Sequence, residues 1–192
     1  MKLYLLSCQD ILQYAQRILP QLPARRQLDH ERTGSDLTLG AGLLLSALLQ
    51  VRRDEDLIYG PQGKPFLAAG KPLFSLSHSG KHVLLGVSDR PIGVDMERRD
   101  RSVSPALRRR ICLPAERDMD PLTVFTRKEC AMKLTGLGFS LSPQDIDTTR
   151  PYPWEGRAYR FFTVEKEGYL ISALTAEEQV SEIQLLTPED LL

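Results

Sequence analysis

The sequence predicts an α+β fold, and two observations lead to this prediction. Each half of the chain contains a segment with the pattern of a helix, at residues 35–50 and 121–134. Each half also contains short strand-like runs separated by turn residues, at 74–97 and 157–174. Helices beside small antiparallel sheets are typical of the α+β class.

The composition is that of an ordinary folded protein. The 192 residues include 25 basic and 25 acidic side chains, and 42% of the chain is hydrophobic. This length suits one large domain or two small ones, and the hydrophobic content excludes wholesale disorder. Because a dedicated nucleic-acid binder normally carries a basic excess, we expect no nucleic-acid partner.

Apolar runs and cysteines bear on the cellular compartment. The first residues contain too short an apolar run for a secretory signal, and the longest apolar stretch, Leu37–Leu49, is too short to span a bilayer. The three cysteines have no CxxC spacing, which argues against a disulfide framework or a zinc site. We therefore expect a cytoplasmic protein with no membrane partner.

The elements of the first half follow from periodicity and turn chemistry. Lys2–Ser7 has the pattern of a strand, and Asp10 is placed to cap a helix that reaches Leu19. A second helix is expected at about 35–50, where apolar residues on nearly all sides indicate burial. The glycines and prolines of 60–65 indicate a loop. Strands are expected at 74–78, 82–88 and 92–97.

The second half begins with an Arg-rich segment, 98–121, which we expect to be a linker with a short helix. Pro121–Leu134 is a clear helix, because Gly136 supplies the residue that commonly ends one in the left-handed conformation. The remaining elements are expected at 157–164 and 169–174 as a hairpin, near Ile183 as a strand, and from Thr187-Pro188 as a terminal helix.

Two pairs of charged residues are candidates for chemistry. Asp95 and Glu97 are two apart on an expected strand and share one face, where two carboxylates form half of a magnesium site. Glu129 and Lys133 are four apart on a helix, so a carboxylate for a metal or a proton lies beside an amine for a phosphate. A polar strand edge and a surface ion pair are the ordinary alternatives.

Further residues are candidates for binding anions. Ser77 and His78 cannot form a nucleophile–base pair, because neighbours on a strand point to opposite faces. His78 can bind an anion or be structural, and Lys64 can bind a phosphate or be solvated. Lys128 projects about 100° round the helix from Glu129, towards a different neighbour.

Taken together, these motifs resemble the surfactin-type 4′-phosphopantetheinyl transferases of the holo-acyl-carrier-protein synthase superfamily. The resemblance covers residues 60–136 most closely. It depends on four ordered motifs, Gly63-Lys64-Pro65, Phe74–Gly80, Ile92–Glu97 and Lys128–Gly138. Four motifs in this order are far more specific than any one of them.

The resemblance implies a fold and an activity. The implied fold is a pseudo-dimer of two similar halves, here 1–98 and 99–192, each a small antiparallel sheet with packed helices, with the active site in the cleft between them. The implied activity transfers the 4′-phosphopantetheine arm of coenzyme A (CoA) to a serine of an apo acyl, polyketide or peptidyl carrier protein. It uses Mg²⁺ and releases 3′,5′-ADP. An internal pseudo-dimer makes a monomer sufficient.

The resemblance also implies residue roles. Asp95, Glu97 and Glu129 match magnesium-binding carboxylates, and Glu129 is the preferred general base, with Glu97 second. Lys133 matches the lysine on the pyrophosphate, and we assign it to catalysis and to CoA. The other residues expected to bind CoA are Lys64, Ser77, His78 and Lys128.

Three positions depart from the family pattern, and one of them, Cys130 in place of a small residue, concerns only packing. Phe125 stands where the family usually has tryptophan, an exchange that keeps the aromatic packing. Asp36 falls where an arginine for the CoA 3′-phosphate is expected. Arg25, Arg26 or Arg32 can supply that charge, and Arg25 and Arg26 are our choices for CoA binding.

Two other functions remain open at this point. One is a CoA- or nucleotide-binding module without transferase activity, which a lost metal carboxylate would indicate. The other is a magnesium-dependent phosphodiesterase, which needs a water-positioning group that the sequence does not identify.

Six arginines lie within thirteen residues and are offset only by Asp100: Arg98, Arg99, Arg101, Arg108, Arg109 and Arg110. Such a local field can steer a charged partner, and the carrier proteins of this family tend to be acidic beside the modified serine. The alternative is a solvated face whose charges contact only water.

Overall fold

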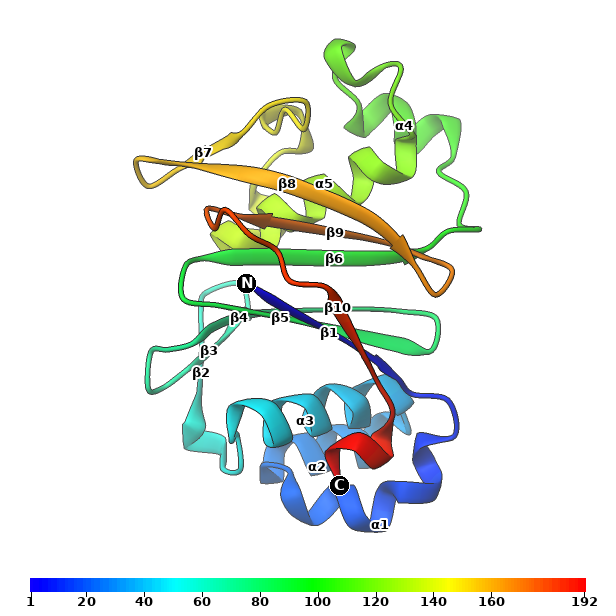
Figure 1. Ribbon diagram of the computed structural model, residues 1–192, viewed down its shortest axis with the longest axis vertical. Helices are drawn as coiled ribbons and strands as arrows, with labels where there is room; N and C mark the ends of the chain where they lie inside the picture. Colours follow the sequence, from blue (N-terminus) through cyan, green and yellow to red (C-terminus); the bar gives the residue numbers. More distant parts are fainter.

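The computed structural model describes residues 1–192, except for the side chain of Phe139, and has the predicted α+β fold (Figure 1). The α-helices are α1 (Ala15–Ile18), α2 (Ala24–Thr33), α3 (Asp36–Leu49), α4 (Pro105–Ile111) and α5 (Pro121–Thr135). The strands are β1 (Lys2–Ser7), β2 (Leu57–Tyr59), β3 (Pro65–Leu67), β4 (Leu73–Ser79), β5 (His82–Ser88), β6 (Ile92–Arg98), β7 (Tyr152–Trp154), β8 (Arg157–Lys166), β9 (Tyr169–Thr175) and β10 (Ile183–Leu186).

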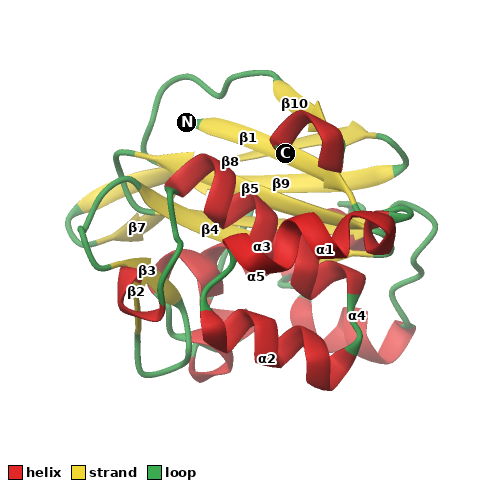
Figure 2. Ribbon diagram, turned by 90° about the horizontal axis from the view of Figure 1, so that it is seen from below, coloured by secondary structure: helices red, strands yellow, loops and turns green.

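The two larger sheets share a β-α-β-β unit, to which β10 is added in the first sheet and β7 in the second. In the first, β1 leads through α3 to the β4–β5 hairpin, and the strand order is β10-β1-β5-β4. In the second, β6 leads through α5 to the β8–β9 hairpin, and the order is β6-β9-β8-β7. Figure 1 shows the second sheet above the first, with α1, α2 and α3 below the first sheet. Figure 2, seen from below, shows α3 in front of the strands. The pseudo-dimer and the division at residue 98 stay predictions; β6, which ends at that division, pairs with β9.

Serine side chains join the two sheets where β4 meets β6. Alternate serines of β4 accept hydrogen bonds from backbone N–H groups of β6 at 3.1–3.3 Å: Ser75 from Val94, Ser77 from Met96 and Ser79 from Arg98. These hydroxyls satisfy N–H groups that would otherwise need a neighbouring strand. The serines thus fix the distance between the sheets at the point where Asp95 and Glu97 lie.

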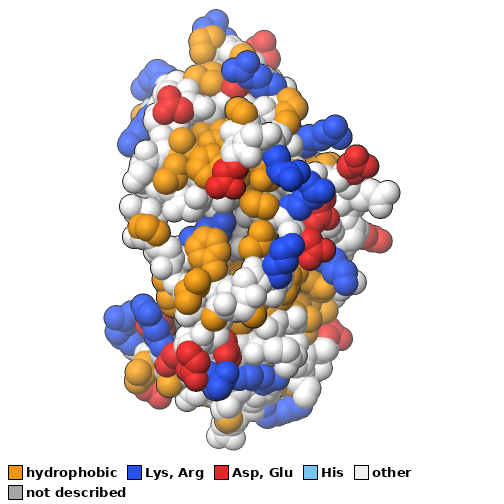
Figure 3. Space-filling view, turned by 90° about the vertical axis from the view of Figure 1, so that its left-hand side faces the viewer, with side chains coloured by type: hydrophobic (Ala, Val, Ile, Leu, Met, Phe, Trp, Pro, Cys, Tyr) orange, Lys and Arg blue, Asp and Glu red, His pale blue; other side chains and the backbone are white. Residues whose placement is uncertain are grey.

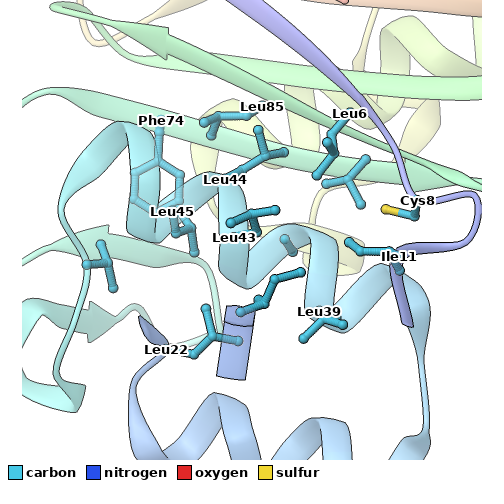
Figure 4. Packing of buried hydrophobic residues seen from close by; sticks show 14 of the residues in the cluster. Leu6, Cys8, Ile11, Leu22, Leu39, Leu43, Leu44, Leu45, Phe74 and Leu85 are labelled. Carbon is cyan, nitrogen blue, oxygen red and sulfur yellow. The ribbon is translucent and has the colours of Figure 1, made fainter. Parts of the chain in front are cut away.

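The core of the first half surrounds α3. Ser35 caps this helix by accepting a hydrogen bond from the Thr38 N–H, and Gln50 ends it in the left-handed conformation. Its leucines pack against β1, β4 and β5, and Figure 4 shows Leu39, Leu43 and Leu44 among them. The apolar composition of 35–50 therefore predicted both the helix and its burial.

Gly93 lets α5 approach β6 closely. A Cβ atom on Gly93 would lie 1.9 Å from the backbone carbonyl oxygen of Cys130 and 2.8 Å from the Leu134 nitrogen. Only glycine fits a backbone approach of this kind. The close contact brings the Glu129 and Lys133 side of α5 towards Asp95.

Several expectations about elements need correction. Asp10 adopts the left-handed conformation and caps nothing, and the following residues form 3-10 turns around the four-residue α1. The sequence did not predict α2, β2, β3 or β7. The first sheet is mixed, because β10 pairs with β1 in parallel. The expected terminal helix is a 3-10 turn, Pro188–Leu191.

Candidate active site

Asp95 lies at the centre of the candidate site. The side chain is 7% exposed, and its Oδ1 accepts hydrogen bonds from the Ser77 hydroxyl and the Lys133 ammonium, each at 2.7 Å. Its Oδ2 is buried and has no hydrogen-bond partner among the described residues. A buried carboxylate oxygen without a partner is costly in free energy, and a hard cation satisfies it well. This oxygen is the observation that fits a magnesium ion.

Glu129, on α5, lies beside Asp95 of β6 and one helical turn before Lys133. Burial raises the pKa of Glu129, the neighbouring charge of Asp95 adds to the rise, and Lys133 and Arg101 oppose it. A carboxylate with a raised pKa is suited to accepting a proton near neutral pH. The predicted neighbourhood of Asp95, Glu129 and Lys133 is therefore present.

A pocket of about 230 Å³ opens next to Glu129 and Lys133. One wall is the loop that contains Lys64, and other lining residues are Leu76 of β4 and Met132 of α5. The surface in Figure 3 carries basic side chains directly beside hydrophobic ones near its middle. A pocket with apolar walls and a few cations suits a ligand that has both apolar and anionic parts.

Lys64 connects its loop to the end of α5. Its ammonium donates a hydrogen bond of 3.0 Å to the Leu134 carbonyl and lies 5.2 Å from the centre of the Phe66 ring. Burial lowers the pKa of Lys64 to about 8. In the unfolded chain the amine has its ordinary pKa of 10.5 and keeps its proton, whereas the folded protein has lost that proton above about pH 8. Because the unfolded state then binds more protons, Lys64 makes the free energy of unfolding rise with pH between about 8 and 10.5.

Glu97 lies on the same strand as Asp95 but has other partners. Its Oε2 accepts a hydrogen bond of 2.8 Å from Ser79, and its Oε1 pairs with the guanidinium of Arg101. Among the described residues, no three or more His, Cys, Asp or Glu side chains lie together as a metal-binding group. In this structure Asp95, Glu97 and Glu129 thus do not form one cluster.

A second pocket, of about 250 Å³, contains His78 and Arg26. Burial lowers the pKa of Arg26, and its buried Nε has no partner among the described residues. Ser77 also lines this pocket, but its hydroxyl is engaged by Asp95 and the Met96 N–H. Leu76 of β4 lines both pockets, so the two adjoin at this residue.

The other candidate cations have different surroundings. Lys128 is 2% exposed, forms an ion pair of 2.9 Å with the buried Glu116, and donates to the carbonyls of Pro143 and Ile146. These three contacts use all its N–H donors inside the protein. Arg25 lies over the Tyr59 ring and lines neither pocket, and Arg32 is exposed and pairs with Asp29. We therefore leave Lys128 and Arg25 out of the proposed CoA site.

Arg101 is a site residue that the sequence reasoning assigned only to partner docking. Besides pairing with Glu97, its guanidinium lies 4.7 Å from the centre of the Phe125 ring. The sequence did contain a signal for this ion pair, because Glu97 and Arg101 carry opposite charges four positions apart.

The comparisons with known proteins concern the part of the chain that carries this site. Residues 91–181 match the family model described as the 4′-phosphopantetheinyl transferase superfamily. This segment includes β6, α5 and the β8–β9 hairpin, and therefore Asp95, Glu97, Glu129 and Lys133.

Two curated relatives match over a similar extent. The chain is similar to the 4′-phosphopantetheinyl transferase AcpT of Salmonella typhimurium, with 39% identity over 110 residues that cover 50% of this chain and 57% of the relative. AcpT of Salmonella typhi matches with the same identity and coverage. The match spans little more than half the length of these relatives.

Within the described residues, the helices are too short or too polar to cross a bilayer.

Proposed function

We propose that this chain transfers the 4′-phosphopantetheine arm of CoA to a serine hydroxyl of an apo carrier protein. The observation that carries the proposal is the buried Asp95 carboxylate, held by Ser77 and Lys133 with one oxygen free, beside a pocket lined by Glu129. The superfamily match of the segment containing these residues supports it. The shared β-α-β-β topology of the two sheets supports the pseudo-dimer.

The CoA diphosphate is the part of the substrate that these charges fit. A diphosphate repels an oxygen nucleophile until its charge is neutralised, and Mg²⁺ supplies that neutralisation when it is bound. The residues that would hold the ion are Asp95 and Glu129, joined by Glu97 once its carboxylate leaves Arg101. Lys133 and Lys64 line the same pocket and provide two further positive charges for the phosphate oxygens.

The transfer itself needs a base but no nucleophile from this chain. The carrier serine oxygen forms a bond to the phosphorus that bears the pantetheine arm, and the bond from that phosphorus to the bridging oxygen breaks. 3′,5′-ADP leaves with the bonding electrons, and Glu129 accepts the serine proton. The raised pKa of Glu129 suits this role.

The second pocket suits the 3′-phosphate of CoA, with Arg26 in place of the family's arginine. We expect dephospho-CoA to be a much poorer substrate than CoA, and Arg26→Gln to narrow that difference by about tenfold or more, because a charge-assisted hydrogen bond contributes about 1.5–3 kcal/mol. The measurement is kcat/KM for both substrates in wild type, Arg26→Gln and the control Arg32→Gln. Equal use of both substrates by the wild type would refute this placement.

The proposed surface for the carrier protein contains three of the six clustered arginines. Arg98, Arg99 and Arg101 are in ion pairs, whereas within the described residues no ion pair involves the three arginines of α4, Arg108, Arg109 and Arg110. Two of the α4 arginines line a pocket with Arg117. Unpaired cations on one helix favour an acidic partner.

Reversing Arg108, Arg109 and Arg110 to glutamate should raise KM for the carrier and leave KM for CoA nearly unchanged. The effect should be largest at low ionic strength, because salt screens exposed charges. The measurement is a salt series of carrier kinetics, with the double reversal Arg17→Glu and Arg90→Glu as a control on remote exposed arginines. Carrier kinetics identical to the wild type at every salt concentration would exclude α4 as the docking surface.

One assay tests the proposed function against its alternatives. The protein is incubated with CoA, Mg²⁺ and an apo carrier protein, and the carrier is weighed intact by mass spectrometry. A carrier with one added phosphopantetheine arm supports transfer. Hydrolysed CoA with an unmodified carrier indicates a phosphodiesterase, and bound but unchanged CoA indicates a binding module; either result overturns the proposal.

A further inference from the structure

Arg101 pairs with one carboxylate of the candidate site, that of Glu97. It reaches from the residues after β6 to the Glu97 carboxylate, and its guanidinium lies over the Phe125 ring at 4.7 Å from the centre. Phe125, Glu129 and Lys133 follow one another at four-residue intervals along one side of α5. Arg101 therefore stands at the Phe125 end of this row, and Lys133 stands at the other end.

The two cations each neutralise a different carboxylate of β6. Lys133 pairs with Asp95, and Arg101 pairs with Glu97. The consequences for the two carboxylates differ. Within the part of the chain that the structure describes, Asp95 keeps one oxygen without a partner, whereas both oxygens of Glu97 are engaged, one by Arg101 and one by Ser79.

We propose that Arg101 is a positioning residue for Glu97 and that its guanidinium must release the Glu97 carboxylate before Glu97 can face a divalent cation. This inference rests on the proposed metal site. A cation that takes Glu97 as a ligand competes with the guanidinium for the same carboxylate oxygens. The Phe125 ring gives the released guanidinium a nearby surface, because a cation is attracted to an aromatic face.

The neighbouring arginines distinguish this contact from a general surface charge. Arg98 pairs with Asp100, and Arg99 pairs with Asp120 and Glu165, none of which belongs to the candidate site. Arg99 and Arg101 have similarly exposed side chains, 43% and 40%. Arg99 is therefore a matched control for the loss of one partly exposed ion pair.

The test measures metal binding without CoA. Mn²⁺ alone is titrated calorimetrically into the wild type, Arg101→Gln, Arg101→Lys, Arg99→Gln and Asp95→Asn. We expect Arg101→Gln to lower the Kd for Mn²⁺ by about threefold or more, since a competing ion pair of this exposure is modest. Arg101→Lys should stay close to the wild type, Arg99→Gln should not change the Kd, and Asp95→Asn should abolish binding.

Thermal unfolding with and without Mn²⁺ gives a second readout. Without metal, Arg101→Gln should unfold at a lower temperature than the wild type, because Glu97 loses its counter-charge; saturating Mn²⁺ should remove this difference. A difference of equal size in both conditions, or an unchanged Kd in Arg101→Gln while Asp95→Asn loses binding, overturns the role of Arg101 alone. Undiminished Mn²⁺ binding by Asp95→Asn overturns the metal site and this inference with it.

Discussion

Asp95→Asn is expected to lower the rate of carrier modification by about 10³-fold or more while the protein stays folded. The amide keeps an acceptor for the Ser77 hydroxyl, but it removes the negative charge that Lys133 faces and the anionic oxygen that is free for a cation. Loss of one preorganised group at a developing charge commonly has an effect of this size. The measurement is the single-turnover rate by intact mass.

The companion variant Glu129→Gln removes the proposed base or ligand without changing side-chain size. It should abolish transfer, a larger effect than that of Asp95→Asn. Asp100→Asn, on an exposed carboxylate outside the site, should leave the rate unchanged. Near-wild-type transfer by Glu129→Gln at saturating Mg²⁺ would show that Glu129 is neither the general base nor a metal ligand.

Gly93→Ala should destabilise the whole protein and impair the site at the same time. The new methyl group would lie 1.9 Å from the Cys130 carbonyl oxygen, and a backbone atom in the middle of α5 cannot move aside as a side chain can. We expect a loss of about 3 kcal/mol or more in the free energy of unfolding, which lowers Tm by about 6–12 °C. Thermal and urea unfolding provide the measurement.

Gly60→Ala is the control for this substitution. A methyl group there would meet only the Phe66 ring at 3.2 Å and the Lys64 carbonyl oxygen at 3.7 Å, so it should change Tm by far less. If Gly93→Ala were as stable as Gly60→Ala, the close approach of α5 to β6 would not be what holds Glu129 and Lys133 beside Asp95.

Local periodicity predicted the parts of the fold that depend on near neighbours. The apolar run of α3, the helix of α5 with its Gly136 end, the alternation of β4 and the apolar runs and turn residues around β5 and β6 were all recognisable from the sequence. The polar helix α2 was missed because none of its residues is buried, which leaves no apolar stripe to detect. The parallel pairing of β10 with β1 joins opposite ends of the chain and has no local signal.

The site shows the same limit. The spacing of Glu129 and Lys133 predicted one helix face, but the partners of each charge depend on packing between distant segments. Lys133 reaches Asp95 across 38 positions, and Lys64 reaches Leu134 across 70. Lys128 resembled its charged neighbours in sequence, yet the buried Glu116 and two loop carbonyls surround it. A partner's burial cannot be read from the spacing of charges along one helix.

The central claim is that Asp95 holds a divalent cation against the diphosphate of CoA. Anomalous diffraction from crystals grown with CoA and Mn²⁺ tests it most directly, because the metal is located without reference to activity. We predict one strong anomalous peak within bonding distance of Asp95 Oδ2, with the diphosphate between that peak and Lys133. A fully bound CoA with no peak at Asp95, or with the peak at another site, would contradict it.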